Sequence, residues 1–80
     1  MADFFNVIEQ FIEIKIKEGE IKERLSSTGE RNMRQVEREL KNNNITIDAA
    51  IGKFLKERNY YLAFGRDRHA VEKLKEMLKH

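Results

Sequence analysis

The sequence predicts a mainly α fold, a small bundle of about four helices with one short extended segment at 60–64. Two observations favour this class. The chain of 80 residues contains no proline and four glycines, too few turn-forming residues for a fold rich in strands. Apolar residues also recur at spacings of three and four along most of the chain, which is the period of an amphipathic helix. We therefore expect a single helical domain covering residues 1–80.

The first segment, residues 3–25, carries two competing patterns. Residues 12–17 alternate strictly between apolar and charged, as a half-buried strand does, and Glu18-Gly19 could then form a hairpin turn. Such a strand would give an α+β domain resembling a winged helix. A helix with a bend or break near Gly19 is favoured, because the apolar residues of the segment follow helical spacing: Phe4, Phe5, Ile8, Phe11, Ile12 and Ile16.

Two helices are predicted in the middle of the chain. Ser27 and Glu30 have the spacing of a capping box, so one helix is expected to start there. The three asparagines at 42–44 are expected to end it, because asparagine tolerates the left-handed conformation that closes helices. Thr46 is the expected N-cap of the next helix, which should end near Asn59.

The last part of the chain holds the extended segment and a fourth helix. The aromatic-rich segment at 60–64 is bounded by Gly65 and is typical of a short strand or an extended connector. Asp67 is the expected N-cap of the last helix. That helix has a narrow apolar face, formed by Ala70, Val71, Leu74, Met77 and Leu78.

Composition limits how such a small chain is stabilised and where it acts. The chain has no cysteine and two histidines, which excludes disulfides and the usual zinc sites, and we expect no metal and no cofactor. A domain of this size has a thin core, so self-association is the stabilising device left, and we expect a homodimer. No apolar run approaches the roughly 18 residues of a membrane span, and the start lacks the features of a signal peptide. The expected location is cytoplasmic, without a membrane partner.

Catalysis is not expected of this sequence. A cysteine nucleophile is absent, and the glycines at 19, 29, 52 and 65 form no phosphate-binding loop. No carboxylate lies in an apolar stretch that would raise its pKa for acid–base work. We therefore predict no enzyme, no catalytic residue and no small-molecule substrate.

The predicted helix that follows Ser27 carries the clearest candidate for a binding function. Four cations spaced by three, four and three residues share one arc about 80° wide, opposite the apolar stripe of the same helix. They are Arg31, Arg34, Arg38 and Lys41. Such a stripe can hold about four phosphates through contacts that weaken with salt. The pattern is equally typical of a solvated helix face, because Glu30 and Glu37 have the spacing of ordinary ion pairs with two of the cations.

A second basic group surrounds the aromatic segment. Arginines interleaved with aromatic rings can hold phosphates while the rings stack on bases. The members of this group are Arg58, Tyr60, Tyr61, Arg66, Arg68 and His69. Alternatively, the rings fill the core and the arginines lie at a solvated turn. Adjacent side chains of an extended segment point to opposite faces, so one of the two tyrosines is expected to be exposed.

The outer face of the predicted helix after Thr46 contains a glycine that needs a reason. Gly52 costs about 1 kcal/mol relative to alanine in a helix interior. A close approach by a partner helix, a phosphate backbone or a neighbouring segment would explain it, and so would neutral drift.

Two functions remain open from the sequence. One is a nucleic-acid-binding regulator, with DNA favoured over RNA, that uses the cationic stripe and the basic aromatic group. The other is a protein-interaction module, such as an adaptor, an assembly subunit or a small inhibitor. Its interface would be the apolar N-terminal helix, with large side chains as anchors: Phe4, Phe5, Ile8 and Phe11. The stripe gives nucleic-acid binding a slight advantage.

Overall fold

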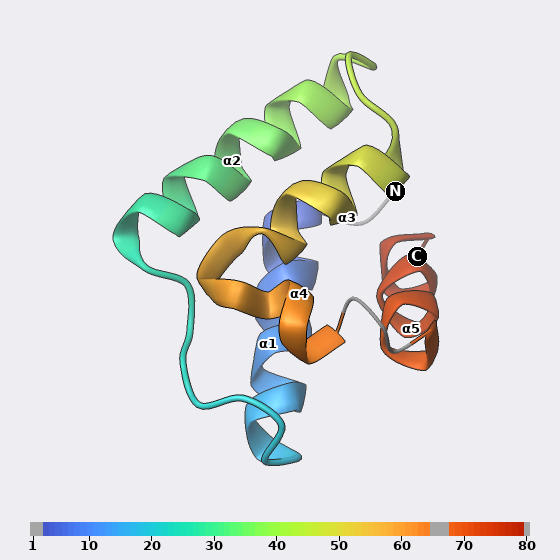
Figure 1. Ribbon diagram of the computed structural model, residues 1–80. Helices are drawn as coiled ribbons and strands as arrows, with labels where there is room; N and C mark the ends of the chain where they lie inside the picture. Colours follow the sequence, from blue (N-terminus) through green and yellow to red (C-terminus); the bar gives the residue numbers. More distant parts are fainter. Residues whose placement is uncertain (1–2, 65–67, 80) are drawn as a thin grey trace.

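The computed structural model describes residues 3–64 and 68–79, which form five α-helices and one turn of 3-10 helix (Figure 1). No strand is present in these residues, so the prediction of a mainly α bundle is confirmed. None of the helices described is long and apolar enough to cross a membrane. In chain order the elements are α1 (Phe4–Lys17), α2 (Ser27–Lys41), α3 (Ile47–Leu55), η1 (Glu57–Asn59), α4 (Tyr60–Phe64) and α5 (Arg68–Lys79).

The first helix, α1, contains residues 12–17, so the alternative of a strand there is wrong. The Asp3 carboxylate caps the helix by accepting from the Phe5 N–H at 3.1 Å. The helix ends where Gly19 adopts a positive φ of 77°, and the Glu20 N–H closes the turn on the Lys15 carbonyl at 3.0 Å. Residues 21–26 then continue without helix, so the predicted break near Gly19 is a true end.

Side-chain caps also define α2 and α3. The N-cap of α2 is Ser26, one residue earlier than predicted, and its Oγ accepts from the Gly29 N–H at 3.0 Å. Asn43 has the left-handed φ of 60° expected of the asparagine turn. Thr46 caps α3 as predicted, with its Oγ1 accepting from the Ala49 N–H at 3.1 Å.

The extended segment predicted at 60–64 is helical instead. Helix α3 ends at Leu55 rather than near Asn59, and the chain kinks at Arg58, whose φ of 45° is left-handed. A helical turn then brings two aromatic residues four apart close together on one buried face, whereas in an extended segment they would lie about 13 Å apart. The ring centroids of Tyr60 and Phe64 are 5.9 Å apart. The predicted boundary at Gly65 and cap at Asp67 lie outside the described residues.

The core surrounds α1 from several sides. Helix α1 packs against α2 and α5, and in Figure 1 it passes behind α3 and α4. The Phe11 ring meets Phe54 of α3 edge-on, with centroids 6.0 Å apart, and Phe64 of α4 at 5.2 Å. The apolar residues of α1 are therefore enclosed by the other helices of the same chain.

Candidate nucleic-acid interface

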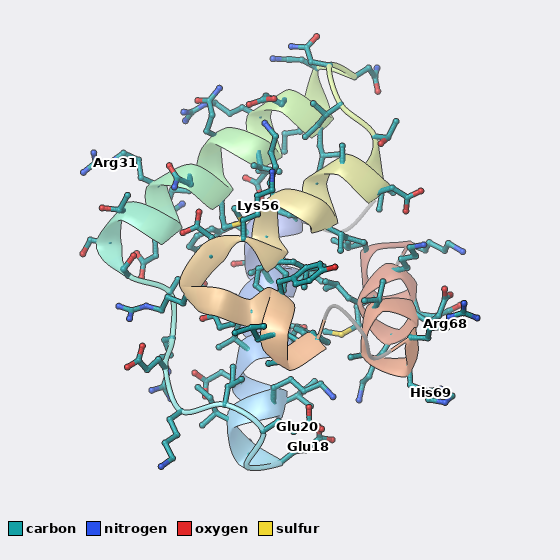
Figure 2. The ribbon with its side chains drawn as sticks, viewed as in Figure 1. Glu18, Glu20, Arg31, Lys56, Arg68 and His69 are labelled. Carbon is teal, nitrogen blue, oxygen red and sulfur yellow. The ribbon has the colours of Figure 1, made fainter. Side chains whose placement is uncertain are left out.

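The cationic stripe lies on the outer face of α2. Met33, Val36 and Leu40 are buried on the opposite face, against the rest of the bundle. The side chains of the stripe are all exposed, and Arg31 projects away from the ribbon in Figure 2. The stripe is thus a continuous cationic surface, formed by Arg31, Arg34, Arg38 and Lys41.

The four cations differ in what they contact. Lys41 is paired with Glu37, with 3.7 Å between Nζ and Oε1. Arg38 donates to the side-chain oxygen of Gln35 on the same helix. The guanidinium of Arg34 lies over the ring of Phe5, with its Cζ 4.1 Å from the ring centroid. Among the described residues, the three arginines of the stripe have no carboxylate within ion-pair distance.

Two carboxylates lie near the Lys41 end of the stripe and cap α1. The Phe5 N–H donates to Glu37 Oε2 at 2.9 Å and to Asp3 Oδ1 at 3.1 Å. The pKa of the Asp3 carboxyl is lowered, first by its hydrogen bond with Glu37 and further by the amides at the helix start and by Lys41. Because Glu37 already pairs with Lys41, the three arginines are the cations of the stripe that have no carboxylate partner among the described residues.

The second basic group does not assemble into a surface. Tyr60 is 2% exposed, and its hydroxyl donates to the Glu23 carbonyl at 3.0 Å, so its ring is not available to stack on a base. Arg58 is paired with the Glu23 carboxylate at 2.6 Å. Tyr61 is 56% exposed, which confirms that one tyrosine of the pair is outside.

Arg68, which follows the aromatic segment, lies away from the stripe. Arg66 is outside the described residues, and Arg68 is exposed at the start of α5. Figure 2 shows Arg31 and Arg68 on opposite sides of the molecule, with His69 beside Arg68. Arg68 and His69 therefore lie apart from the Arg31 end of the stripe.

The predicted protein interface at the N-terminus is not on the surface. Its four members are among the buried residues of this chain: Phe4, Phe5, Ile8 and Phe11. Their apolar area is used to form the core, so in this structure they present no face to a second protein. The expectation that these residues anchor a partner is therefore not supported by their position.

Several features of the surface and core were not foreseen from the sequence. Leu62 is 82% exposed, because a helical turn directs it away from the buried pair Tyr60 and Phe64. Lys15 is buried, and its Nζ lies 3.1 Å from Glu18 and 3.6 Å from Glu20, at the end of α1 (Figure 2). The helical period alone predicts the position of Leu62 once the segment is assigned to a helix.

The Lys15 ion pairs hold the turn that ends α1. Burial acts to lower the pKa of the Lys15 ammonium, but the hydrogen bond to Glu18 and the charges of Glu20 and Glu18 outweigh it and raise the pKa. A buried, charged lysine that is paired with two carboxylates has a structural role, because both partners come from its own chain.

The acidic side chains and histidines of the described residues give no candidate metal centre. No group of histidine, aspartate and glutamate side chains among them is placed to hold a metal ion. A shallow groove between α2 and α3 is lined by side chains of both charges, with Lys53 paired to Glu39 at 3.7 Å. No protein-family model, curated protein or solved structure matches the chain.

Proposed function

We propose that this protein binds duplex DNA through the phosphates that face the outer side of α2. One observation carries the proposal: the three arginines of the stripe are exposed on one helix face without a carboxylate partner among the described residues. An arginine paired with a carboxylate would have its charge neutralised. An arginine without such a partner is available to bind a polyanion. The binding would take place in the cytoplasm, as a regulatory contact without catalysis.

The dimensions of the stripe fit one strand of a duplex. Ten residues separate Arg31 from Lys41, which corresponds to about 15 Å along the helix axis. A strand of B-form DNA carries one charge per roughly 3.4 Å along its axis, so about four phosphates lie within that length. Four cations facing four phosphates position the protein on the backbone without reading base sequence.

The location of the aromatic rings favours a duplex over a single strand. Proteins that bind single strands combine a basic groove with exposed rings on which bases stack. Tyr60 is buried, Tyr61 lies on α4, and α2 itself contains no aromatic residue. The stripe therefore offers charge alone, which suits the phosphate surface of a duplex.

Binding to a short labelled duplex, measured by fluorescence anisotropy over a salt series, tests the proposal. For the unmodified chain we expect the logarithm of affinity to fall with the logarithm of salt with a slope of about −3 to −4. The triple variant Arg31→Gln, Arg34→Gln and Arg38→Gln should lose at least about tenfold in affinity, and its slope should fall toward −1, because three phosphate contacts are removed.

A matched variant controls for the loss of net charge. The control also removes three positive charges, but from exposed positions of α5: Arg68→Gln, Lys73→Gln and Lys79→Gln. This variant should keep the salt slope and most of the affinity of the unmodified chain. Equal losses in the two triple variants, or no salt-dependent binding by the unmodified chain, would overturn the proposal. Single-stranded DNA of the same length serves as a competitor and should compete less well.

Binding to a protein partner is the second candidate function, and its surface would lie on α4 rather than at the N-terminal helix. Tyr61 and Leu62 are the large apolar side chains left exposed in the described residues, 56% and 82% respectively, and they are adjacent on α4. A second copy of the chain is the partner to test first, because a homodimer is expected for a domain of this size. Light scattering should give twice the chain mass of 9.5 kDa and the monomer mass for Leu62→Glu; a monomer before substitution excludes the homodimer.

A further inference from the structure

Arg34 is held differently from the other arginines of the stripe. Its guanidinium lies over the ring of Phe5, with Cζ 4.1 Å from the centroid, and that ring belongs to the core, 5% exposed. The backbone under the ring is fixed as well, because the Phe5 N–H donates to the carboxylates of Asp3 and Glu37. Arg34 therefore rests on a rigid support that belongs to another helix.

The neighbouring arginines have no such support. Arg38 donates to the side chain of Gln35 on the same helix, and both residues are exposed to solvent. The side chain of Arg31 forms no hydrogen bond or ion pair with the residues at 3–64 and 68–79. The stripe thus combines one positioned guanidinium with two that are free to reorient.

The N–H donors of a guanidinium lie in the plane of the group. Where the planar face of the group contacts a ring, these donors stay available to form a bidentate pair with a phosphate. Part of the rotamer freedom is already lost before binding, so the cost of ordering this side chain on the ligand is smaller. A lysine at the same position would keep the charge but lose the planar pair of donors.

We propose that Arg34 is the phosphate anchor of the stripe and that Phe5 is its positioning residue, so that one backbone phosphate of the duplex is gripped at a fixed point of α2. This inference rests on the proposed DNA-binding function and deepens it. Arg31 and Arg38 then act as mobile charges on either side, and Lys41 contributes least because Glu37 already pairs with it.

Two charge-conserving substitutions test the anchor. Arg34→Lys should weaken duplex binding by about three- to tenfold, because it removes both the bidentate geometry and the support of the ring. Arg38→Lys is the matched charge-conserving comparison on the same face, and it should weaken binding less than Arg34→Lys does, because Arg38 is not held against a ring. Both variants keep four cations in the stripe, so the salt slope should be the same for both and close to that of the unmodified chain.

The role of Phe5 is tested with a second matched pair. Phe5→Leu should weaken binding about as much as Arg34→Lys, and combining the two should add little, because both remove the same positioned contact. Phe4→Leu removes a ring from a neighbouring buried position that has no cation–π contact with the arginine. It should lower thermal stability similarly and leave the affinity unchanged.

The outcomes separate the anchor from the function beneath it. Equal effects of Arg34→Lys and Arg38→Lys, while the triple glutamine variant still loses binding, overturn the anchor and leave DNA binding in place. Absence of salt-dependent binding by the unmodified chain overturns the function itself. If Phe5→Leu fails to fold at the assay temperature, the comparison of the two lysine variants decides the question alone.

Discussion

Helices α1 and α2 are nearly equal in length, 14 and 15 residues, but they are used in opposite ways. Seven residues of α1 are buried, and they extend around a wide arc that α2, α3, α4 and α5 cover. Four residues of α2 are buried along one line, and its other side is cationic and exposed. In the described part of this chain the central helix contributes the largest share of the buried apolar residues, and the outer helix keeps one charged face exposed.

Among the buried residues of α1, Phe11 is the position where a substitution should lower stability most. Its ring is 1% exposed and meets the rings of Phe54 and Phe64. Phe11→Ala should lower the free energy of unfolding by about 3–5 kcal/mol, because a cavity replaces aromatic contacts from two other helices. Urea denaturation followed by circular dichroism measures this loss.

A half-buried residue of the same helix provides the reference for Phe11. Ile14 is only partly covered, so Ile14→Ala should cost markedly less than Phe11→Ala. Similar losses at the two positions would show that α1 is not enclosed as described, and that its apolar arc is covered by something outside the chain.

The wide arc of α1 also explains what the sequence could and could not predict. Spacing and caps identified the helices at Thr46 and after the connecting serines, because local hydrogen bonds decide those starts. The apolar residues near Phe11 suggest an interface with a partner when only the sequence is considered. The sequence does not show how many sides of a helix are covered by the rest of its own chain. The stripe on α2 was predicted correctly as exposed, since a helix with one narrow apolar line has one inner face.

Local pattern failed where tertiary contacts decide the conformation. Residues 12–17 alternate like a strand, yet they continue a capped helix whose core contacts lie at helical spacing. Aromatic residues favour strands, but at 60–64 a helical turn brings two rings four apart close together in the core. The kink at Arg58 that makes this possible has no signal in the sequence, because arginine rarely adopts a left-handed conformation.

Tyr60, in the helix that closes over α1, gives a smaller and pH-dependent effect. Burial raises the pKa of its hydroxyl above the usual 10.0, and the charges of Glu23 and Glu57 add to this although Arg58 opposes it. The folded state therefore holds this proton more tightly than the unfolded state. The corresponding stability is present below pH 10 and is lost as the pH rises through the raised value.

One substitution isolates this titration. The chain has two tyrosines, so in Tyr61→Phe the tyrosinate absorbance reports Tyr60 alone, and its midpoint should lie above 10. Tyr60→Phe should lower stability at neutral pH by about 0.5–1.5 kcal/mol, because the hydrogen bond to the Glu23 carbonyl is lost. It should also reduce the loss of stability in alkali. A midpoint at or below 10 would contradict the burial of this ring.

The smallest expected effect is that of a substitution at Gly52, on the outer face of α3. A side chain built at Gly52 of α3 would meet no atom within 4 Å, so the chain itself gives no reason for the glycine. Gly52→Ala should raise the free energy of unfolding by about 0.5–1 kcal/mol, since alanine restricts the unfolded state and fits the helix. Gly19→Ala is the opposite control and should destabilise, because the φ of +77° at Gly19 is strained for alanine. If α2 alone faces the duplex, Gly52→Ala leaves DNA affinity unchanged; a weaker affinity would instead extend the binding surface from α2 onto the outer face of α3.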